Sequence, residues 1–477
     1  MPGSARSDAA RIRIVAEASV ADIVARKVLM IAHAFPPTGG PGVQRPAKFA
    51  KYLPLFGWNP VVWSAEHVDG LPRDESLSED IPDEVTVHAR SGGGVQSARR
   101  ALRGFIAAHE RKGAAAMAAS QFAAAIDWRL AAWHTSHSFP DDCAAWAKKS
   151  IRPLMDLIRR EGVELIFSTF SPASNHLLAL ELKRRTRLPW VAEFRDLWVD
   201  DCRYQAATPR KRAAHTRLQQ EILDRADAVI GVTPRQTAIL ASYAPGQQGK
   251  FRTITNGFDP DDFADVGTAA PTGRSFVMAH VGRFDLARTR DELFSACRAF
   301  AAQLGPQKSR FLLRIVGHAN SVAREKLQAT GLPCEFVGYV SHAEAIRAMR
   351  SAHGLLLTVP EGENGDTIIC GKLFEYLAAG RPILVVGPRD GECERIVRTC
   401  RAGLATCFES EPIVGALQEL YDAWRAGRPL RGCPEDALEQ FSRVELTRRL
   451  GQIFDYLSTP RASRAARGRA PRPVGAV

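Results

Sequence analysis

The chain has 477 residues, of which 45% are hydrophobic and 24% are charged, values ordinary for a globular protein. This length exceeds what one hydrophobic core normally supports, so two domains are expected. The formal net charge is +12, and no run of 18 apolar residues occurs, so the sequence predicts no membrane-spanning helix. Nine cysteines without a C-x-x-C pair predict free thiols in a reducing cytoplasm.

The two ends of the chain differ from the rest. Residues 1–26 mix charged and apolar side chains and lack the apolar stretch of a signal peptide, so a disordered N-terminal arm is expected. Residues 458–477 contain five arginines and no acid, which predicts a disordered basic tail. This tail is either a solvated arm or a segment attracted to phosphates and anionic lipid.

Between residues 27 and 265, short apolar runs alternate with helical patterns, which is typical of a parallel sheet covered by helices. Strands are expected at 27–34, 60–64, 85–88, 163–169, 190–194, 228–232 and 251–255, and helices at 43–55, 173–186, 210–226 and 234–242. Residues 97–132 are rich in alanine and too long for a simple connection, so a helical insertion is expected. It is either a solvated hairpin or an element that contacts an acceptor or a membrane.

A polar stretch at 266–274 predicts a linker, after which the alternation restarts over 275–435. Strands are expected at 276–281, 311–316, 335–337, 354–358 and 382–386, followed by a last amphipathic helix over 436–457. The fold class is therefore α/β, with two doubly wound units. A ligand is expected in the cleft between them, at the carboxyl ends of the strands.

The stretch FPPTGGPGVQRPAKF lies where the first strand turns into the first helix. Gly39, Gly40 and Gly42 allow close approach of a ligand to the backbone, and the free N–H groups of a helix start suit a diphosphate. The same residues are equally consistent with a simple turn. No G-x-G-x-x-G follows a strand, and GDTIICGKL has five residues between its glycines and Leu after Lys372. Dinucleotide and ATPase chemistry are therefore disfavoured.

Two further stretches carry charged residues at predicted helix starts. In HVGRFDLARTRDEL, Arg283 and Arg288 have the geometry to grip a diphosphate, or they are surface arginines. GKLFEYLAAGRPIL predicts a helix over about 369–379, with an apolar stripe formed by Leu373, Phe374, Leu377 and Ala378. Lys372 and Glu375 share another face, where they form a surface ion pair or hold the phosphates and ribose of a nucleotide.

The motifs KVLMIAHAFPPTGGPGVQRPAKFAKYLPLFGWNPVVWS, VAEFRDLW, ITNGFD and KLFEYLAAGRPIL occur in this order. Over residues 27–457, the chain resembles bacterial GT-B glycosyltransferases of family 4. The resemblance implies two Rossmann-like domains facing each other across a cleft, with the acceptor on the first and the nucleotide sugar on the second. It also implies retention of anomeric configuration, no metal or other cofactor, and a last helix that crosses back to the first domain.

The resemblance also assigns roles to residues of the second domain. It implies that Glu375 holds the ribose, and that Arg283 with Arg288 or Lys372 holds the diphosphate. Arg288 stands where the family usually has lysine.

In the first domain, the resemblance implies that Gly39, Gly40 and Gly42 close over the sugar phosphate. Arg195 and Asp196, from the EFRD stretch, would lie beside the reacting sugar, with Arg195 where many members carry histidine.

Two acidic positions need separate interpretation. The family's second acid falls at Thr367, so Asp366, a nearby glutamate or a backbone group would take its place. The DPD stretch at 259–261 resembles a metal-binding DxD motif, but it opens a predicted helix, and capping is the favoured interpretation. No metal is assigned.

The sequence therefore predicts a retaining glycosyltransferase that uses a UDP- or GDP-sugar and a glycan or lipid-linked acceptor in bacterial surface polysaccharide synthesis, with no nucleic-acid partner. A UDP-sugar 2-epimerase and a non-catalytic scaffold in a glycan-assembly complex are the alternatives. Peripheral contact with the inner membrane face is a further hypothesis, because KYLPLFGW at 51–58 combines lysine, aromatics and leucine. The same stretch fits an ordinary helix that ends at Gly57.

Overall fold

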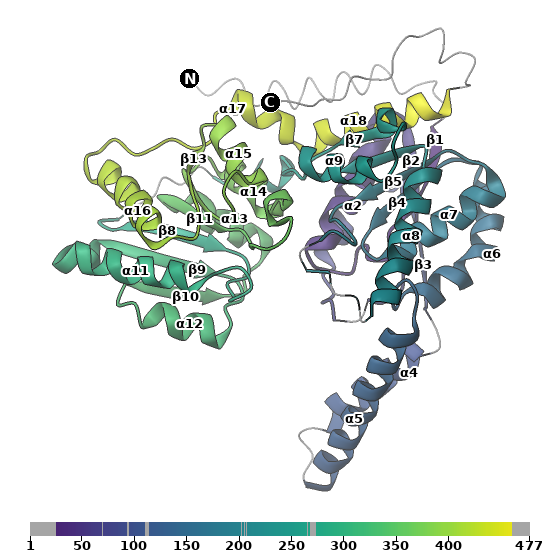
Figure 1. The fold of residues 1–477 in the computed structure, drawn as a ribbon, viewed down its shortest axis with the longest axis horizontal. Helices are drawn as coiled ribbons and strands as arrows, with labels where there is room; N and C mark the ends of the chain where they lie inside the picture. The colour runs from purple at the N-terminus through teal and green to yellow at the C-terminus, as the bar shows by residue number, and fades with distance from the viewer. Residues whose placement is uncertain are drawn as a thin grey trace.

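A computed structural model describes residues 25–459, except 69, 93–94, 110–113, 202, 205, 207, 265 and 268–272. The expected N-terminal arm, the basic tail beyond residue 459 and part of the linker therefore lie outside the described residues. Two α/β units lie side by side, and a helical hairpin projects from the first (Figure 1). Among the described helices, none combines the length and hydropathy that a membrane crossing needs.

The first unit is built on a seven-stranded parallel sheet with the order β3-β2-β1-β4-β5-β6-β7. Its strands are β1 (Arg26–Ile31), β2 (Trp58–Ala65), β3 (Thr86–Arg90), β4 (Val163–Phe170), β5 (Trp190–Phe194), β6 (Ala228–Gly231) and β7 (Phe251–Thr253). The order reverses direction between β1 and β4, and such a switch point opens a crevice at the carboxyl ends of the strands.

Helices cover both faces of this sheet, which explains why its strands are apolar on both sides. One core lies beneath α6 (Ala144–Glu161), α7 (Ala173–Thr186), α8 (Pro209–Arg225) and α9 (Pro234–Ser242). The other lies beneath α2 (Pro41–Tyr52) and α18 (Arg443–Ser458). Thr208 and Thr233 cap α8 and α9, each followed by proline at the first helical position.

The second unit has a six-stranded parallel sheet with the order β10-β9-β8-β11-β12-β13. Its strands are β8 (Phe276–Val281), β9 (Phe311–Val316), β10 (Cys334–Gly338), β11 (Gly354–Thr358), β12 (Ile383–Val386) and β13 (Gly403–Thr406). One face packs on α11 (Asp291–Leu304), α12 (Ser321–Gln328) and α16 (Ser410–Arg425). The other packs on α13 (His342–Arg350), α14 (Gly371–Ala379) and α15 (Glu392–Thr399).

The last helix does cross back to the first unit, but the expected single helix is wrong. The segment is divided into α17 (Glu435–Leu438), a 3-10 turn (Glu439–Phe441) and α18. At the break, Ser442 is extended and pairs with Phe258, which exchanges backbone hydrogen bonds with Phe441 and Arg443. Beyond the break, Phe454 packs on Trp58 with ring centroids 5.4 Å apart. The chain is therefore clasped to the first unit before α18 begins.

The insertion is helical, as predicted, but extends further. It consists of α4 (Val95–His109) and α5 (Ala114–His137), which pack against each other and lead away from the sheet in Figure 1. By contrast, the stretch 51–58 is not a free interfacial helix. It ends α2 and forms the 3-10 turn Leu53–Phe56, and Tyr52, Leu53 and Trp58 are buried. The ordinary-helix interpretation of that stretch is the one the structure shows.

Most expected strands and helices are present with small shifts at their ends, and the α/β fold class is confirmed. β13 and α6 were not predicted. β13 has four half-buried residues and thus a weak apolar signal. The remaining short helices are α3 (Ser76–Glu79) and α10 (Asp261–Ala264).

Loops at the carboxyl ends of both sheets touch each other. The Thr233 hydroxyl, after β6, donates to the Thr367 carbonyl, after β11, at 3.4 Å. The Asn364 amide donates to the Asp200 carbonyl, after β5, at 2.8 Å. These contacts place the two switch-point edges against each other, as a ligand site between the units requires.

A histidine ion pair also joins the units. The Nε2 atom of His342, in α13, lies 3.2 Å from a carboxylate oxygen of Asp262, in α10. This hydrogen bond raises the pKa of His342, burial opposes the rise, and the charge of Glu375 adds to it while Lys372 opposes it. Because the folded pKa lies above the unfolded value, the pair stabilises the fold below pH 6.5, and this contribution disappears as pH rises through the folded pKa.

We therefore expect the melting temperature of the wild type to fall between about pH 6 and pH 9, because the ion pair is lost over this range. In His342→Gln, which lacks the pair, this fall should be absent. The measurement is thermal unfolding of both proteins across this range, with His318→Gln as a control on the same unit. Parallel pH profiles for the wild type and His342→Gln would refute the pairing.

Candidate functional site

Helix α14 carries Lys372 and Glu375 and is fixed to the end of β8. Leu373, Phe374 and Leu377 are buried as predicted, but Tyr376 and Ala379 are buried too, and Ala378 is only partly buried. The Tyr376 hydroxyl accepts a hydrogen bond from the Val281 N–H at 2.7 Å. This bond ties α14 to the strand that leads into the arginine loop. The apolar stripe in the sequence does not predict this hydrogen bond.

Lys372 and Glu375 form an ion pair of 2.6 Å between Nζ and Oε2. Their side chains are 33% and 20% exposed, so both reach solvent without being free surface groups. An ion pair three residues apart on a helix contributes only about 0.2–0.5 kcal/mol. A ligand with hydroxyl or phosphate groups can therefore displace either partner at little cost.

Arg283 and Arg288 are brought together by a carboxylate that the sequence analysis did not single out. Their guanidinium groups lie 3.1 and 3.6 Å from the same oxygen of Asp285. Asp285 is 7% exposed, and its other carboxylate oxygen has no hydrogen-bond partner. Arg288 precedes α11 by three residues, so it lies in the loop and not in the helix start that was predicted. The loop presents two adjacent cations, with Arg283 66% exposed.

The glycine loop approaches the protein's own chain closely. The Gly39 N–H donates to the Pro72 carbonyl at 2.7 Å, and a Cβ on Gly39 would lie 3.2 Å from Asp74. Gly40, the residue before α2, has a φ of 108°, which favours glycine. The turn interpretation thus accounts for Gly39 and Gly40, and the Gly39 N–H is already used. Their contact with a ligand stays a prediction.

Arg195 holds two segments of the first unit together. Its guanidinium donates to the Phe170 carbonyl at 2.7 Å, to the Ser171 carbonyl at 3.0 Å and to the Gly42 carbonyl. Burial lowers its pKa. Arg195 therefore positions the start of α2 against the loop after β4.

The two acids next to Arg195 in the EFRD stretch, Glu193 and Asp196, form ion pairs with other residues. Asp196 is 48% exposed and lies 2.7 Å from Arg203. Glu193 is fully buried, 2.8 Å from Arg45 of α2 and 2.7 Å from the Thr169 hydroxyl. Arg45 donates further to the Ile254 carbonyl at 2.8 Å. Glu193 is thus enclosed by its own partners.

Asp366 and Thr367 lie in the loop after β11, against the first unit. Asp366 forms an ion pair with Arg235 of α9. The Thr367 hydroxyl donates to the Asn364 carbonyl at 2.7 Å, and the residue is 7% exposed. The position of the missing family acid is therefore occupied by an interdomain contact, and binding of a sugar there stays a prediction.

The DPD stretch belongs to an ionic network. Carboxylate oxygens of Asp80, Asp259 and Asp262 lie within 4.8 Å of one another, a grouping that could hold a metal ion. However, Lys48 lies 2.5–3.0 Å from all three, and Lys51 lies 3.0 Å from Asp259. These two ammonium groups neutralise two of the three carboxylate charges. Asp259 also accepts from the N–H of residue 261, the first residue of α10, at 3.0 Å, so it satisfies one free N–H at the start of that helix.

Arg443, the first residue of α18, was not predicted as a site residue. Its side chain is 6% exposed, and its Nη1 atom has no hydrogen-bond partner. Burial, with repulsion from Arg45, lowers its pKa to about 9, while the charges of Glu193, Asp259 and Glu375 oppose the fall. It is a buried cation at the crossing between units. Nothing in the sequence around Arg443, at the start of an amphipathic helix, indicates that this arginine is buried at the crossing.

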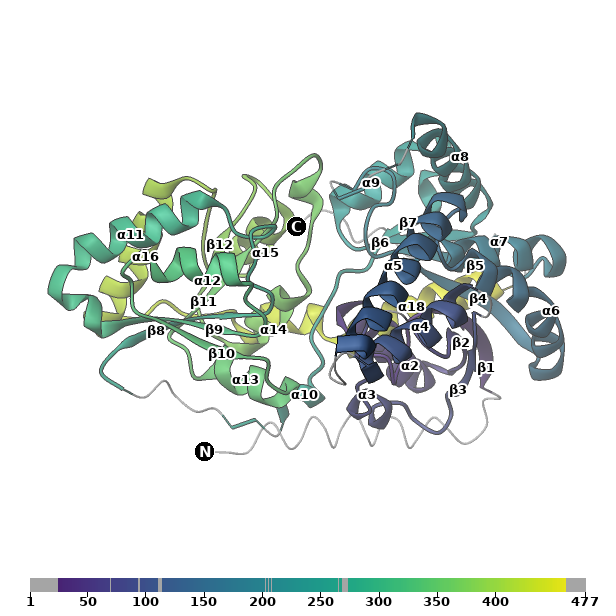
Figure 2. The same ribbon diagram turned by 90° about the horizontal axis from the view of Figure 1, so that it is seen from below.

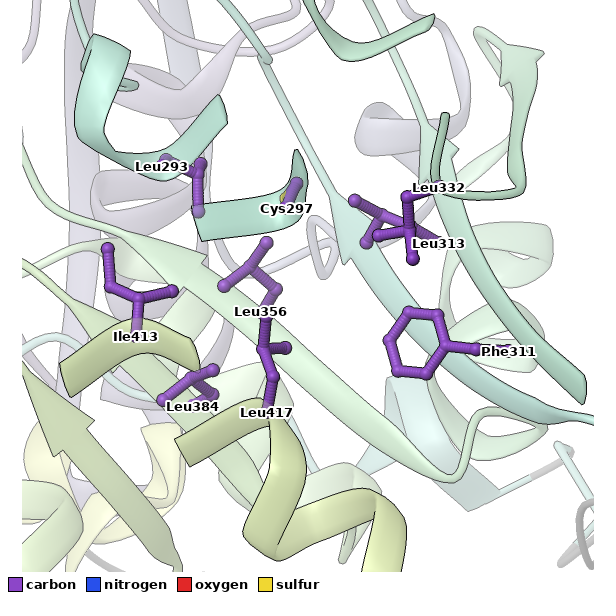
Figure 3. Close-up of a pocket in the computed structure, with 9 residues that line it drawn as sticks. All are labelled: Leu293, Cys297, Phe311, Leu313, Leu332, Leu356, Leu384, Ile413 and Leu417. Carbon is purple, nitrogen blue, oxygen red and sulfur yellow. The ribbon is translucent and has the colours of Figure 1, made fainter. Parts of the chain in front are cut away.

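Two cavities in the second unit lie away from these residues. One, in the core, has a volume of about 10 Å³, and Figure 3 shows its lining of apolar side chains and Cys297. That volume is about one water molecule, and the lining offers no polar partners, so it is a packing gap. The other, of about 770 Å³, is an open surface hollow beside residues 427–435.

The comparisons with known proteins agree with this architecture. The family model for Glycosyltransferase Family 4 matches residues 49–262, and no curated protein matches the chain. Sucrose-phosphate synthase from Thermosynechococcus elongatus has a TM-score of 0.56 at 15% identity, covering 91% of this chain and 99% of that one. HepE from Anabaena, solved with UDP and glucose, has a TM-score of 0.57 at 14% identity, covering 90% and 99%.

A protein assigned as a UDP-N-acetylglucosamine 2-epimerase, from Listeria monocytogenes, has a TM-score of 0.52 at 12% identity, covering 94% of this chain and 99% of that one. At such identities, the solved structures show the fold. The GT-B fold and the resemblance to family 4 glycosyltransferases are confirmed, and with them the prediction of a transferase.

The burial of Glu193 leads to a prediction that distinguishes a structural role of this residue from a catalytic one. Glu193→Ala leaves Arg45 as an unpaired buried charge, so we expect the free energy of unfolding to fall by about 3–5 kcal/mol. Urea denaturation measures this loss. The double variant Arg45→Met/Glu193→Leu should lose less, because no buried charge remains. A stable Glu193→Ala protein that has lost turnover would instead place Glu193 at the reacting sugar.

Proposed function

We propose that this GT-B glycosyltransferase moves a sugar from UDP- or GDP-sugar to a glycan or lipid-linked acceptor, with retention, in bacterial surface polysaccharide synthesis. The observation that carries the proposal is the position of Glu375: a partly exposed carboxylate on a helix pinned to the end of β8, next to the arginine loop. The acceptor class and cellular role rest on the family resemblance.

The second unit offers complementary groups for a nucleoside diphosphate. A carboxylate can accept hydrogen bonds from both vicinal hydroxyls of a ribose, and Glu375 requires only displacement of Lys372 to do so. Arg283 and Arg288 present planar cations suited to the diphosphate. HepE, which has this fold, was solved with UDP and glucose. These features support a UDP- or GDP-linked donor.

The proposed reaction depends on cations that favour the departing diphosphate. Negative charge grows on the leaving group as the sugar bond breaks, and Arg283 and Arg288 are held side by side by Asp285 before the reaction begins. Lys372 adds a third cation once Glu375 engages the ribose. No metal is required in this proposal.

The first unit supplies no evident covalent nucleophile at the EFRD stretch. Glu193 is buried with Arg45, and Asp196 pairs with Arg203. This arrangement supports front-face attack, in which the leaving phosphate takes the proton of the acceptor hydroxyl. Arg195 then acts by keeping these two first-unit segments in register.

A 2-epimerase is the second candidate, because a protein assigned to that activity shares this fold. Epimerisation needs acid–base groups around the sugar C2. His33 and His176 do not favour it, since burial lowers their pKa values to about 4 and about 3, respectively. Product analysis separates the two: release of an epimerised sugar and UDP without acceptor identifies an epimerase, and sugar incorporated into acceptor identifies a transferase. A protein inert in both assays would fit the non-catalytic scaffold.

The ribose role of Glu375 predicts a loss of nucleotide affinity. A thermal-shift comparison of UDP, GDP, ADP and CMP identifies the preferred base, and calorimetric titration then measures its dissociation constant. Glu375→Ala should weaken binding at least about tenfold, or about 1.4 kcal/mol. The matched control is Glu335→Ala, an acid of β10 in the same unit that pairs with Arg314. Equal affinities for wild type and Glu375→Ala would remove the ribose assignment.

Arg283 is expected to act mainly in the transition state. Arg283→Ala should lower kcat by about 10²–10³-fold and change donor affinity much less, because the diphosphate gains charge only as the bond breaks. Arg283→Lys keeps the charge but loses the planar fork, so it should recover part of the rate. Steady-state kinetics with donor titration measures both parameters. Equal losses in kcat and affinity would show uniform binding instead.

A further inference from the structure

The α4–α5 hairpin presents an apolar surface that no part of the described chain covers. Helix α5 has only two charged residues, Asp127 and Arg129, among its 24. Phe122 and Trp128 are 71% and 70% exposed, and Met117 is 51% exposed. Each large exposed side chain keeps apolar area in contact with water, and clusters of such side chains mark interaction surfaces.

The inner side of α5 is already used within the hairpin. Ser120 and Ala123 are buried, and Asp127 is bound by Arg99 at 2.8 Å and Arg103 at 3.1 Å, both from α4. At 100° per residue, Phe122 and Trp128 lie on the outer half of α5, about 120° apart around the helix, and Met117 lies at the edge of that half. Asp127 is therefore neutralised between the two helices, whereas the outer side of α5 carries aromatic and apolar groups.

The charge of the hairpin indicates an anionic partner. Residues 95–137 contain six cations (Arg99, Arg100, Arg103, Arg111, Lys112 and Arg129) and two acids (Glu110 and Asp127), so their net charge is 6 − 2 = +4. Two copies of this hairpin would bring like charges together. A surface of anionic lipid headgroups instead attracts the cations and accepts the aromatic rings at its apolar boundary.

The hairpin is also placed to reach a surface. Figure 1 shows α4 and α5 projecting beyond the first unit, and Figure 2, from below, shows them over that unit and separate from the second. The 24 residues of α5 correspond to a length of about 36 Å. The outer end of the hairpin can therefore contact a flat surface that the two sheets do not touch.

We propose that the α4–α5 hairpin docks this protein on membranes with anionic headgroups, by placing Phe122 and Trp128 at the interface while the exposed Arg129 contacts the headgroups. The inference does not depend on the identity of the sugar donor. It moves the membrane contact away from the stretch 51–58, in which Tyr52 and Trp58 are buried and Phe56 is half-buried.

The test is co-sedimentation of the full-length protein with vesicles of phosphatidylcholine alone and of phosphatidylcholine with phosphatidylglycerol in equal parts. We expect binding to the anionic vesicles, weaker binding in about 0.5 M NaCl, and weak binding to phosphatidylcholine alone. The double variant Phe122→Ser/Trp128→Ser should reduce the apparent affinity for anionic vesicles about tenfold or more. The basic tail is present in both proteins, so the difference reports on the hairpin.

Two matched variants complete the design. Phe122→Trp/Trp128→Phe keeps aromatic rings and should bind like wild type. Val322→Ser removes an exposed apolar side chain of α12, in the second unit, and should also bind like wild type. Thermal unfolding checks that each variant is folded, and the single variant Trp128→Ser, with an intermediate loss, replaces the double variant if that one unfolds.

Three results would overturn the proposal. Equal vesicle binding by wild type and Phe122→Ser/Trp128→Ser would assign binding to another region, such as the basic tail. Equal binding to both vesicle types would remove the role of charge. A wild-type dimer in sedimentation velocity that the double variant dissociates would identify a second copy as the occupant. Each readout is independent of catalysis, so loss of the proposed glycosyl transfer would leave this test intact.

Discussion

The relation between the two units depends on the clasp between Phe258 and the segment around Ser442. Phe258 receives the returning chain through backbone hydrogen bonds to Phe441 and Arg443, after which α18 packs on the first sheet. A chain that crosses once between two domains leaves them free to separate, whereas this one crosses at the linker and again at the clasp. The clasp thus limits the positions that the second unit can take, and it brings the buried Arg443 within the electrostatic reach of Glu375.

The charged residues fall into two groups that burial separates. Arg45 with Glu193, and Lys48 with Asp259, are buried ion pairs whose partners come from distant parts of the chain. In a low dielectric such pairs are costly to break, so they hold α2 against β5 and against the segment just before α10. Lys372, Glu375, Arg283 and Arg288 retain exposed surface and form short-range pairs that a ligand can replace cheaply. This difference, more than the number of charges, indicates where a nucleotide sugar would bind.

Several properties of the molecule could be predicted from the sequence alone. The alternation of short apolar runs with helical patterns is local, since a strand buried on both faces must be apolar throughout; hence β5, β8, β9 and β11 were predicted to the residue. The pairing of Lys372 with Glu375 was one of the two interpretations of α14, because three residues of separation on a helix bring side chains together whatever surrounds them. Helical content in the insertion followed from its alanine.

Other properties depend on contacts between segments that are far apart in the sequence. Asp285, which joins Arg283 and Arg288, looks like any loop acid in the sequence, and Tyr376 looks like a polar break in an apolar stripe. Glu193 is only two positions from Arg195 in the sequence, but its partner is Arg45, 148 positions away. Sequence by itself determined the elements, the fold class and the candidate residues, because these follow from local propensity and pattern. Tertiary structure alone decided which charges are enclosed and which face solvent, because burial and partner choice depend on how α2, β5 and α18 pack together.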